Sequence, residues 1–161
     1  FGVAEGGGCR TFGKHLAAQG LSLTGFDSFE GLQENWSGHG RGAEKGRYGL
    51  DGILPDVQDN VVLVKGMVQD TLPAWLEAQN GTPFTFVHFD LDTYTPTAFT
   101  LAAIRDHLVE GTVLLFDELY GYPGWRNHEF KALQENLPDD SYRFVAFGEQ
   151  PVGIQMTRKP S

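Results

Sequence analysis

The sequence predicts an α/β protein with a doubly wound, mostly parallel sheet, and three features support this fold class. Short apolar runs alternate with segments of helical periodicity, which is typical of parallel sheets covered by helices. Acidic residues follow two of these runs, at Asp90 and at Asp117. Only residues 148–152 join the last two runs, too few for a parallel crossover, so these strands should pair antiparallel. We expect seven strands in the order 3-2-1-4-5-7-6, with strand 7 antiparallel.

The first elements are a strand end, a glycine-rich loop and a helix. Residues 1–3 are expected to be the tail of a strand whose beginning lies outside the sequence. A helical pattern with Phe12 and Leu16 on one face then runs to Gly20. Glycines let the backbone approach a ligand, and a helix N-terminus favours anionic groups. We expect four residues of this segment to contact a cofactor: Gly2, Val3, Gly6 and Gly8.

The second strand, Leu21 to Phe26, ends at Asp27, and Ser28 follows. Asp27 lies roughly 20 residues after the glycine loop, the spacing at which an acid binds a ribose hydroxyl in nucleotide-binding α/β folds. A turn or helix-capping role for Asp27 is the alternative. We favour cofactor binding and assign Ser28 to the same site.

The periodic pattern is lost between residues 28 and 55, where glycines are frequent. A loop of this length inside a compact domain is usually functional or disordered, and we interpret it as a lid over the binding crevice. His39 is the only histidine of this segment and is a candidate base. A solvated loop histidine is the simpler interpretation.

A third strand, Asn60 to Lys65, precedes a helix that we expect to begin at Thr71, with Pro73 in its first turn. Asp70 then lies in the loop at the strand end, where a carboxylate can accept a hydrogen bond from an adenine amino group. A favourable interaction with the helix dipole is the alternative. We include Asp70 among the cofactor-binding residues.

The central strand is the apolar run of residues 84–89, which ends at Asp90 and Asp92. Thr95 begins the following helix, which is expected to extend to about Leu108. Asp92 is interpreted as a substrate contact or as a cap of this helix.

The next strand, residues 112–116, ends at Asp117 and Glu118. Because the carboxyl ends of parallel strands share one edge of a sheet, Asp90, Asp117 and Glu118 should gather in one crevice. Gathered carboxylates repel one another, so either a hard cation neutralises them or one keeps a raised pKa. Oxygen donors suit Mg²⁺, Ca²⁺ or Mn²⁺ rather than zinc. The alternative is a set of helix-capping and lid-bonding acids without an ion.

An aromatic loop, residues 119–125, follows this strand and is interpreted either as a cap on the sheet edge or as a substrate wall. The last helix is expected around residues 130–137. The final strands are expected at residues 142–147 and 153–157.

Composition limits the class of protein. The chain has 161 residues and 40% hydrophobic residues, which fits a single domain over residues 1–161. A net charge of −9 argues against nucleic acid and anionic membranes as partners. One cysteine, no long apolar run and no signal-peptide pattern lead us to expect a cytoplasmic protein.

Strand–helix alternation that closes in an antiparallel hairpin resembles the Rossmann-like fold of class I S-adenosylmethionine-dependent methyltransferases. Short sequence motifs along nearly the whole chain make the resemblance more specific, and they are similar to those of the macrocin O-methyltransferase (TylF-type) family. These motifs are FGVAEGGG at residues 1–8, GFDSFEGL at 25–32, KG at 65–66 with DTLP at 70–73, FDLDTY at 89–94 and FDE at 116–118.

The resemblance implies S-adenosylmethionine across the glycine loop, with Asp27 on its ribose. It also implies a Mg²⁺ ion with three ligands. One is an aspartate of the Asp-x-Asp motif, here Asp90, and the other two are the acidic pair after the next strand, here Asp117 and Glu118. Glu118 stands where the family often has a second aspartate. The implied activity is methyl transfer to a hydroxyl of a sugar or natural product, with Asp90 and Asp117 as catalytic residues.

Two other functions remain as alternatives at this point. A nicotinamide-dependent oxidoreductase would use the same glycine loop and Asp27, although the acidic residues and the terminal hairpin speak against it. A non-catalytic nucleotide- or metal-binding module is the second. The expected partner is a small molecule, and homo-oligomerisation is left open.

Overall fold

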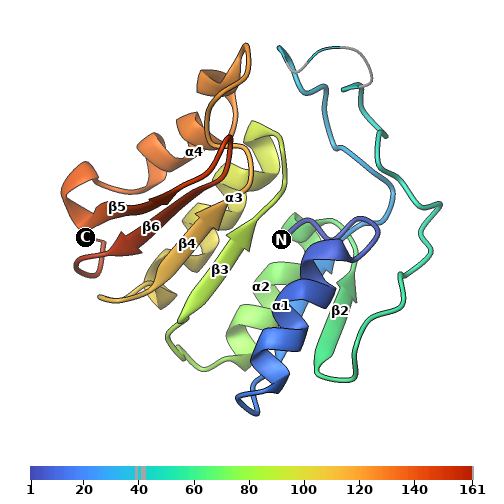
Figure 1. The fold of residues 1–161 in the computed structure, drawn as a ribbon, viewed down its shortest axis with the longest axis horizontal. Coiled ribbons are helices and arrows are strands. Elements are labelled where there is room, and N and C mark those ends of the chain that lie inside the picture. The colour runs from blue at the N-terminus through green and yellow to red at the C-terminus, as the bar shows by residue number, and fades with distance from the viewer. Residues whose placement is uncertain (39, 41–42, 161) are drawn as a thin grey trace.

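The computed structural model describes residues 1–38, 40 and 43–160. Within these ranges the chain forms six strands and four α-helices (Figure 1). The strands are β1 (Leu23–Asp27), β2 (Val61–Lys65), β3 (Phe86–Phe89), β4 (Val113–Phe116), β5 (Tyr142–Phe147) and β6 (Val152–Met156). The helices are α1 (Gly7–Ala17), α2 (Val68–Ala78), α3 (Tyr94–Ile104) and α4 (Glu129–Asn136).

The strands form two sheets. β1 pairs with β2 in parallel, and the second sheet has the order β3-β4-β6-β5. β3 and β4 are parallel, whereas β6 runs antiparallel to both of its neighbours. The antiparallel pair predicted at the end of the chain is therefore confirmed. The single seven-stranded sheet is not confirmed by these six strands.

Residues 1 and 2 lie between the two sheets and explain this difference. The Gly2 N–H donates to the carbonyl oxygen of Phe26 at 3.0 Å. On the other side, the Asp90 N–H donates to the Phe1 carbonyl at 2.9 Å, and the N-terminal amine donates to the His88 carbonyl at 2.7 Å. Two residues do not form a strand, so β1 and β3 are bridged only near their carboxyl ends. A cavity of about 100 Å³ lies between them, below this bridge.

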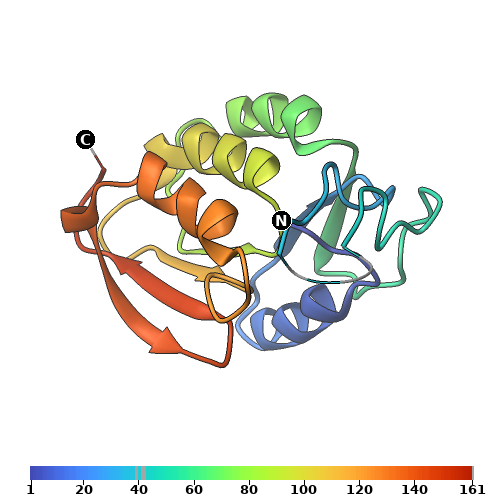
Figure 2. The ribbon, with the colours of Figure 1, turned by 90° about the horizontal axis from the view of Figure 1, so that it is seen from above.

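Helices lie on both sides of the strands, as Figure 2 shows, with α2, α3 and α4 on one side and α1 on the other. β3 illustrates the alternation that this requires. Val87 and Phe89 belong to the main core, which the side chains of α2, α3 and α4 share. Phe86 and His88 face α1, where the Phe12 ring lies 5.1 Å and 5.0 Å from their ring centres. The face of β3 toward the main core is buried, as its apolar sequence predicts, whereas Phe86 and His88 on the α1 side are half-buried.

Two helices begin earlier than predicted. α3 begins at Tyr94, one residue before the predicted start, and α2 begins at Val68 rather than at Thr71. The Thr71 hydroxyl donates to the Met67 carbonyl at 3.0 Å, a bond within the helix rather than a cap. The prediction that Asp70 lies in a strand-end loop is therefore wrong, because Asp70 is in the first turn of α2.

Candidate active site

The glycine-rich loop approaches the end of β3 so closely that one position requires glycine. Gly2 has a φ of +77°, and a Cβ atom there would lie 1.7 Å from the Asp90 carbonyl oxygen. Any side chain would force the loop away from β3. The end of this loop therefore lies directly beside the acidic residues.

Asp27 fixes the same loop from the end of β1. Its Oδ2 atom accepts the backbone N–H groups of Val3 at 2.7 Å and of Ala4 at 2.8 Å. Its Oδ1 atom accepts the Phe29 N–H at 2.8 Å. Charge-assisted bonds of this kind are among the stronger hydrogen bonds in proteins. Asp27 thus shapes the loop, and a carboxylate has further lone pairs with which it can also accept from a ligand.

A cavity of about 300 Å³ opens at this edge. Three predicted cofactor-binding residues line it, namely Gly2, Asp27 and Ser28, as do Asp90 and Glu118. The cavity thus joins the predicted cofactor and metal residues.

The other four predicted cofactor-binding residues lie outside this lining. Val3 is buried beneath α1, Gly6 precedes that helix, and Gly8 faces the His88 ring. Asp70 lines a neighbouring groove instead. Cofactor contacts from these four residues stay predictions.

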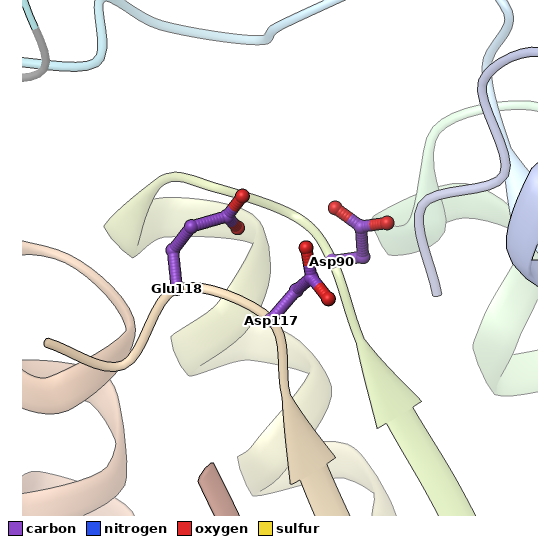
Figure 3. A group of neighbouring side chains, drawn as sticks. All are labelled: Asp90, Asp117 and Glu118. Atoms are coloured by element: carbon purple, nitrogen blue, oxygen red, sulfur yellow. The ribbon is translucent and has the colours of Figure 1, made fainter. Parts of the chain in front are cut away.

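The structure brings together the three predicted metal ligands, Asp90, Asp117 and Glu118 (Figure 3). One carboxylate oxygen of each lies within 4.8 Å of those of the other two. The Asp117 N–H donates to the Phe89 carbonyl at 2.9 Å, which extends the pairing of β3 with β4 past the strand ends. The backbone therefore holds Asp90 and Asp117 side by side.

The charges in this cluster affect one another. Burial raises the pKa of Asp90, and the neighbouring Asp117 raises it further. The pKa of Asp117 is lowered because of the His88 imidazole, whose Nε2 lies 3.7 Å from Asp117 Oδ1. Asp117 is therefore the carboxylate most easily kept ionised, while Asp90 needs a compensating positive charge.

Asp92 also belongs to this cluster. It has a φ of +61°, and the Thr93 N–H donates to the Leu91 carbonyl at 2.6 Å across it, a strained γ-turn. Burial and the nearby Asp90 raise the pKa of Asp92 to about 8, and burial together with Asp92 raises that of Glu118 to about 10. The neighbouring Glu118 carboxyl group partly opposes the rise in the pKa of Asp92. The N-cap of α3 is Thr93, not Asp92, and its side chain makes no capping bond. The helix-cap interpretation of Asp92 therefore has no support.

Sequence reasoning missed two residues that contact the cluster. His88 could have been found, because it is the one polar residue in the strand β3. Glu129 is completely buried, and its Oε2 atom accepts the Glu118 N–H at 3.3 Å. An acid in the first turn of a helix usually indicates a dipole interaction at the surface, so nothing in the sequence indicates its burial.

The segment predicted as a lid has no helix or strand in its described part, residues 28–38, 40 and 43–55. Gln33 bonds to Gln69 of α2, and both carboxylate oxygens of Glu34 accept from Thr95 at the start of α3. Trp36, which lines the cavity, donates from Nε1 to the Tyr122 hydroxyl at 3.0 Å. His39 lies outside the described residues.

The aromatic loop fits both of its interpretations. Tyr122 packs edge-on against Trp36 and so supports the cavity wall from behind. Tyr120 packs against Phe147 of β5 and covers the sheet edge, and its hydroxyl donates a hydrogen bond to the Gly148 carbonyl.

The donor set fits a hard divalent cation. All three candidate ligands offer carboxylate oxygens, the class that Mg²⁺ and Mn²⁺ prefer. Among the described residues, the Oε2 atom of Glu118 is buried and has no hydrogen-bond partner. A buried polar atom without a partner lowers the stability of the fold unless a ligand binds it.

The methyltransferase domain family matches residues 1–119, which is most of the chain. The chain belongs to this family. Its fold is similar to a crystal structure of CalS11, the calicheamicin methyltransferase, with a TM-score of 0.77, 28% identity and coverage of 96% of this chain and 70% of that one. An apo structure of CalS11, described as a TDP-rhamnose 3'-O-methyltransferase, gives a TM-score of 0.66, 29% identity and coverage of 96% and 69%.

The O-methyltransferase NovP has the same fold, with a TM-score of 0.70, 20% identity and coverage of 98% of this chain and 70% of NovP. Among curated protein sequences, none matches the chain. The chain is therefore an S-adenosylmethionine-dependent methyltransferase of the TylF-like type, and the predicted enzyme class is confirmed.

None of the helices in the described ranges is long and apolar enough to cross a membrane.

Replacing Asp27 with Asn is expected to weaken both folding and cofactor binding. The amide keeps one acceptor oxygen but turns an NH₂ group toward backbone donors, so the free energy of unfolding should fall by about 1.5–3 kcal/mol. Urea denaturation and calorimetry with S-adenosylhomocysteine measure the two effects. The matched control is Asp106→Asn, on a side chain that is 92% exposed. Unchanged stability would show that the Asp27 bonds do not hold the loop.

The metal-free protein should lose stability as the pH rises. Asp92 and Glu118, with native pKa values of about 8 and about 10, hold protons in the folded state that they release on unfolding at neutral pH. Their contribution is complete below about pH 4 and is lost as the pH rises through these native values. Urea denaturation in chelator between about pH 5 and about pH 9 measures this decline. A flat profile contradicts the burial of protonated carboxyls.

Proposed function

We propose that this enzyme transfers the methyl group of S-adenosylmethionine to a hydroxyl of a sugar or sugar-bearing natural product, with a divalent cation, Mg²⁺, at the acidic cluster. One observation carries the proposal: Asp27, at the glycine loop, and Asp90 and Glu118, at the cluster, line the same cavity. A bound cofactor and a metal-bound acceptor would then be neighbours. The name TDP-rhamnose 3'-O-methyltransferase, given to CalS11, supports a sugar hydroxyl as the acceptor.

The cofactor would lie along the loop side of the cavity. Gly2 lines this side of the cavity, and Asp27 and Ser28 offer acceptors for the ribose of the cofactor. The cofactor supplies the methyl group on a positively charged sulfur. Trp36 and Leu32 border the same space and would keep water from the reacting groups.

Asp90 and Asp117 would hold the cation, with Glu118 as the third ligand. A cation bound there supplies charge that orients an acceptor oxygen and lowers its pKa. The task of the protein is alignment, and the paired strand ends give Asp90 and Asp117 fixed positions for it. Asp92 lines the cavity and remains a proposed substrate contact.

Membership of the methyltransferase family leaves no support for the oxidoreductase alternative. Hydride transfer also does not require an acidic cluster of this kind. A binding module without activity would bind S-adenosylhomocysteine but would not form it from S-adenosylmethionine.

Removal of the metal should abolish methyl transfer and leave cofactor binding nearly intact. With TDP-rhamnose and related sugar nucleotides as acceptors, formation of S-adenosylhomocysteine should require Mg²⁺ and stop in excess chelator. Asp90→Asn should weaken Mg²⁺ binding at least about tenfold, or about 1.4 kcal/mol, because it removes a ligand charge. Calorimetry should show unchanged affinity for S-adenosylhomocysteine.

Two outcomes contradict this account. Full transfer in excess chelator would mean that the acids serve another purpose. Loss of S-adenosylhomocysteine binding in Asp90→Asn, but not in the exposed control Asp106→Asn, would assign Asp90 to the cofactor or the fold.

A further inference from the structure

We propose that Glu129 is a positioning residue for the acidic cluster: its buried carboxyl group fixes the turn that carries Asp117 and Glu118 in the geometry that binds a divalent cation. The inference rests on the metal-assisted function proposed above. It extends that function to a residue that comes from α4 and is not among the residues that line the cavity.

The turn after β4 is held from two sides. The Asp117 N–H donates to the Phe89 carbonyl of β3, and the next N–H along the chain, that of Glu118, donates to Glu129 Oε2 at 3.3 Å. The peptide before Asp117 is thus bonded to the sheet, and the peptide after it is bonded to α4. In Figure 3 the side chains of Asp117 and Glu118 leave this turn toward the same space as that of Asp90.

The burial of Glu129 is not explained by the needs of its helix. An acid that only complements the dipole of α4 would remain in water, where the interaction costs no desolvation. Glu135 of the same helix shows this ordinary arrangement, with a half-exposed carboxylate that accepts from the Tyr94 hydroxyl and pairs with Lys131. Glu129, in contrast, is 0% exposed, and its Oε1 atom has no partner in the described part of the chain.

Glu129 is also distinct from the ligands themselves. The group of described residues whose carboxylate oxygens all lie within 4.8 Å of one another comprises Asp90, Asp117 and Glu118, without Glu129. Its one hydrogen bond to the cluster goes to a backbone N–H. The geometry therefore favours a carboxyl that orients two ligands over a fourth ligand. Groups that orient metal ligands from behind change metal affinity by about 10- to 100-fold when they are removed.

Two replacements separate this role from a general contribution to folding. Glu129→Met keeps the volume of the side chain but loses the acceptor oxygen. Glu129→Gln keeps an oxygen that can accept the Glu118 N–H. Glu129→Met leaves the Glu118 N–H without its acceptor, which lowers stability. It also removes a buried carboxyl group whose Oε1 atom has no partner among the described residues, so the variant should still fold. Glu135→Ala, on the exposed face of the same helix, is the control.

Metal affinity is measured by titration with Mn²⁺, with free Mn²⁺ followed by electron paramagnetic resonance, so the readout does not depend on turnover. Glu129→Met should bind Mn²⁺ about 10- to 100-fold more weakly than the wild type. Glu129→Gln and Glu135→Ala should stay within about threefold of it. Affinity for S-adenosylhomocysteine should change little in all three variants. The thermal unfolding temperature should fall modestly in Glu129→Met, which loses one hydrogen bond, and should change little in the other two.

The outcomes distinguish this inference from the function on which it rests. If the wild type binds Mn²⁺ and folded Glu129→Met binds it equally well, the positioning role is wrong and the proposed function stands. If the wild type binds no Mn²⁺, both are wrong. A tenfold loss in Glu129→Gln also overturns the inference, because it would assign the effect to the carboxyl itself rather than to its bond with the Glu118 N–H.

Discussion

The parallel register of β3 and β4 is the constraint on which the site depends. Phe89 pairs with Phe116, both rings are completely buried, and they stack with their centres 4.8 Å apart. The next backbone bond, from Asp117 to Phe89, carries the same register past the strands. A slip of one residue would turn these rings out of the core and the acids away from one another. Hydrophobic packing of two phenylalanines thus determines where the carboxylates lie.

This placement has an electrostatic cost that a ligand can offset. Burial and mutual repulsion raise the pKa of Asp90 and, to about 8, that of Asp92, so the metal-free fold disfavours ionisation of these acids. The strained turn at Asp92 adds to the cost, and strain of this kind is common at functional sites. A divalent cation would lower the free energy of the ionised cluster and couple metal binding to stability. The contact with Tyr122 holds Trp36 at the wall of the same cavity.

Features that depend on local pattern could be predicted from the sequence. Apolar runs that end in acids located Asp90 and Asp117, and the short final link predicted the antiparallel hairpin. Features that depend on distant contacts or on rare backbone conformations could not be predicted. A positive φ is uncommon outside glycine, and although Asp adopts it more readily than most residues, no local pattern indicates it at Asp92. The burial of Glu129 depends on how α4 packs, and α2 begins after Met67, a residue that offers no capping side chain.

The measurement that tests the central claim most directly is a crystal structure of the enzyme with S-adenosylhomocysteine and Mn²⁺, with data collected at a wavelength where Mn²⁺ scatters anomalously. We predict an anomalous peak within coordination distance of Asp90 and Asp117, on the cavity side of Glu118 and next to the ligand held at Gly2 and Asp27. The claim is contradicted if the ligand is bound but no peak appears at the cluster, or if the ion lies elsewhere while the carboxyl groups of the cluster bond only to one another.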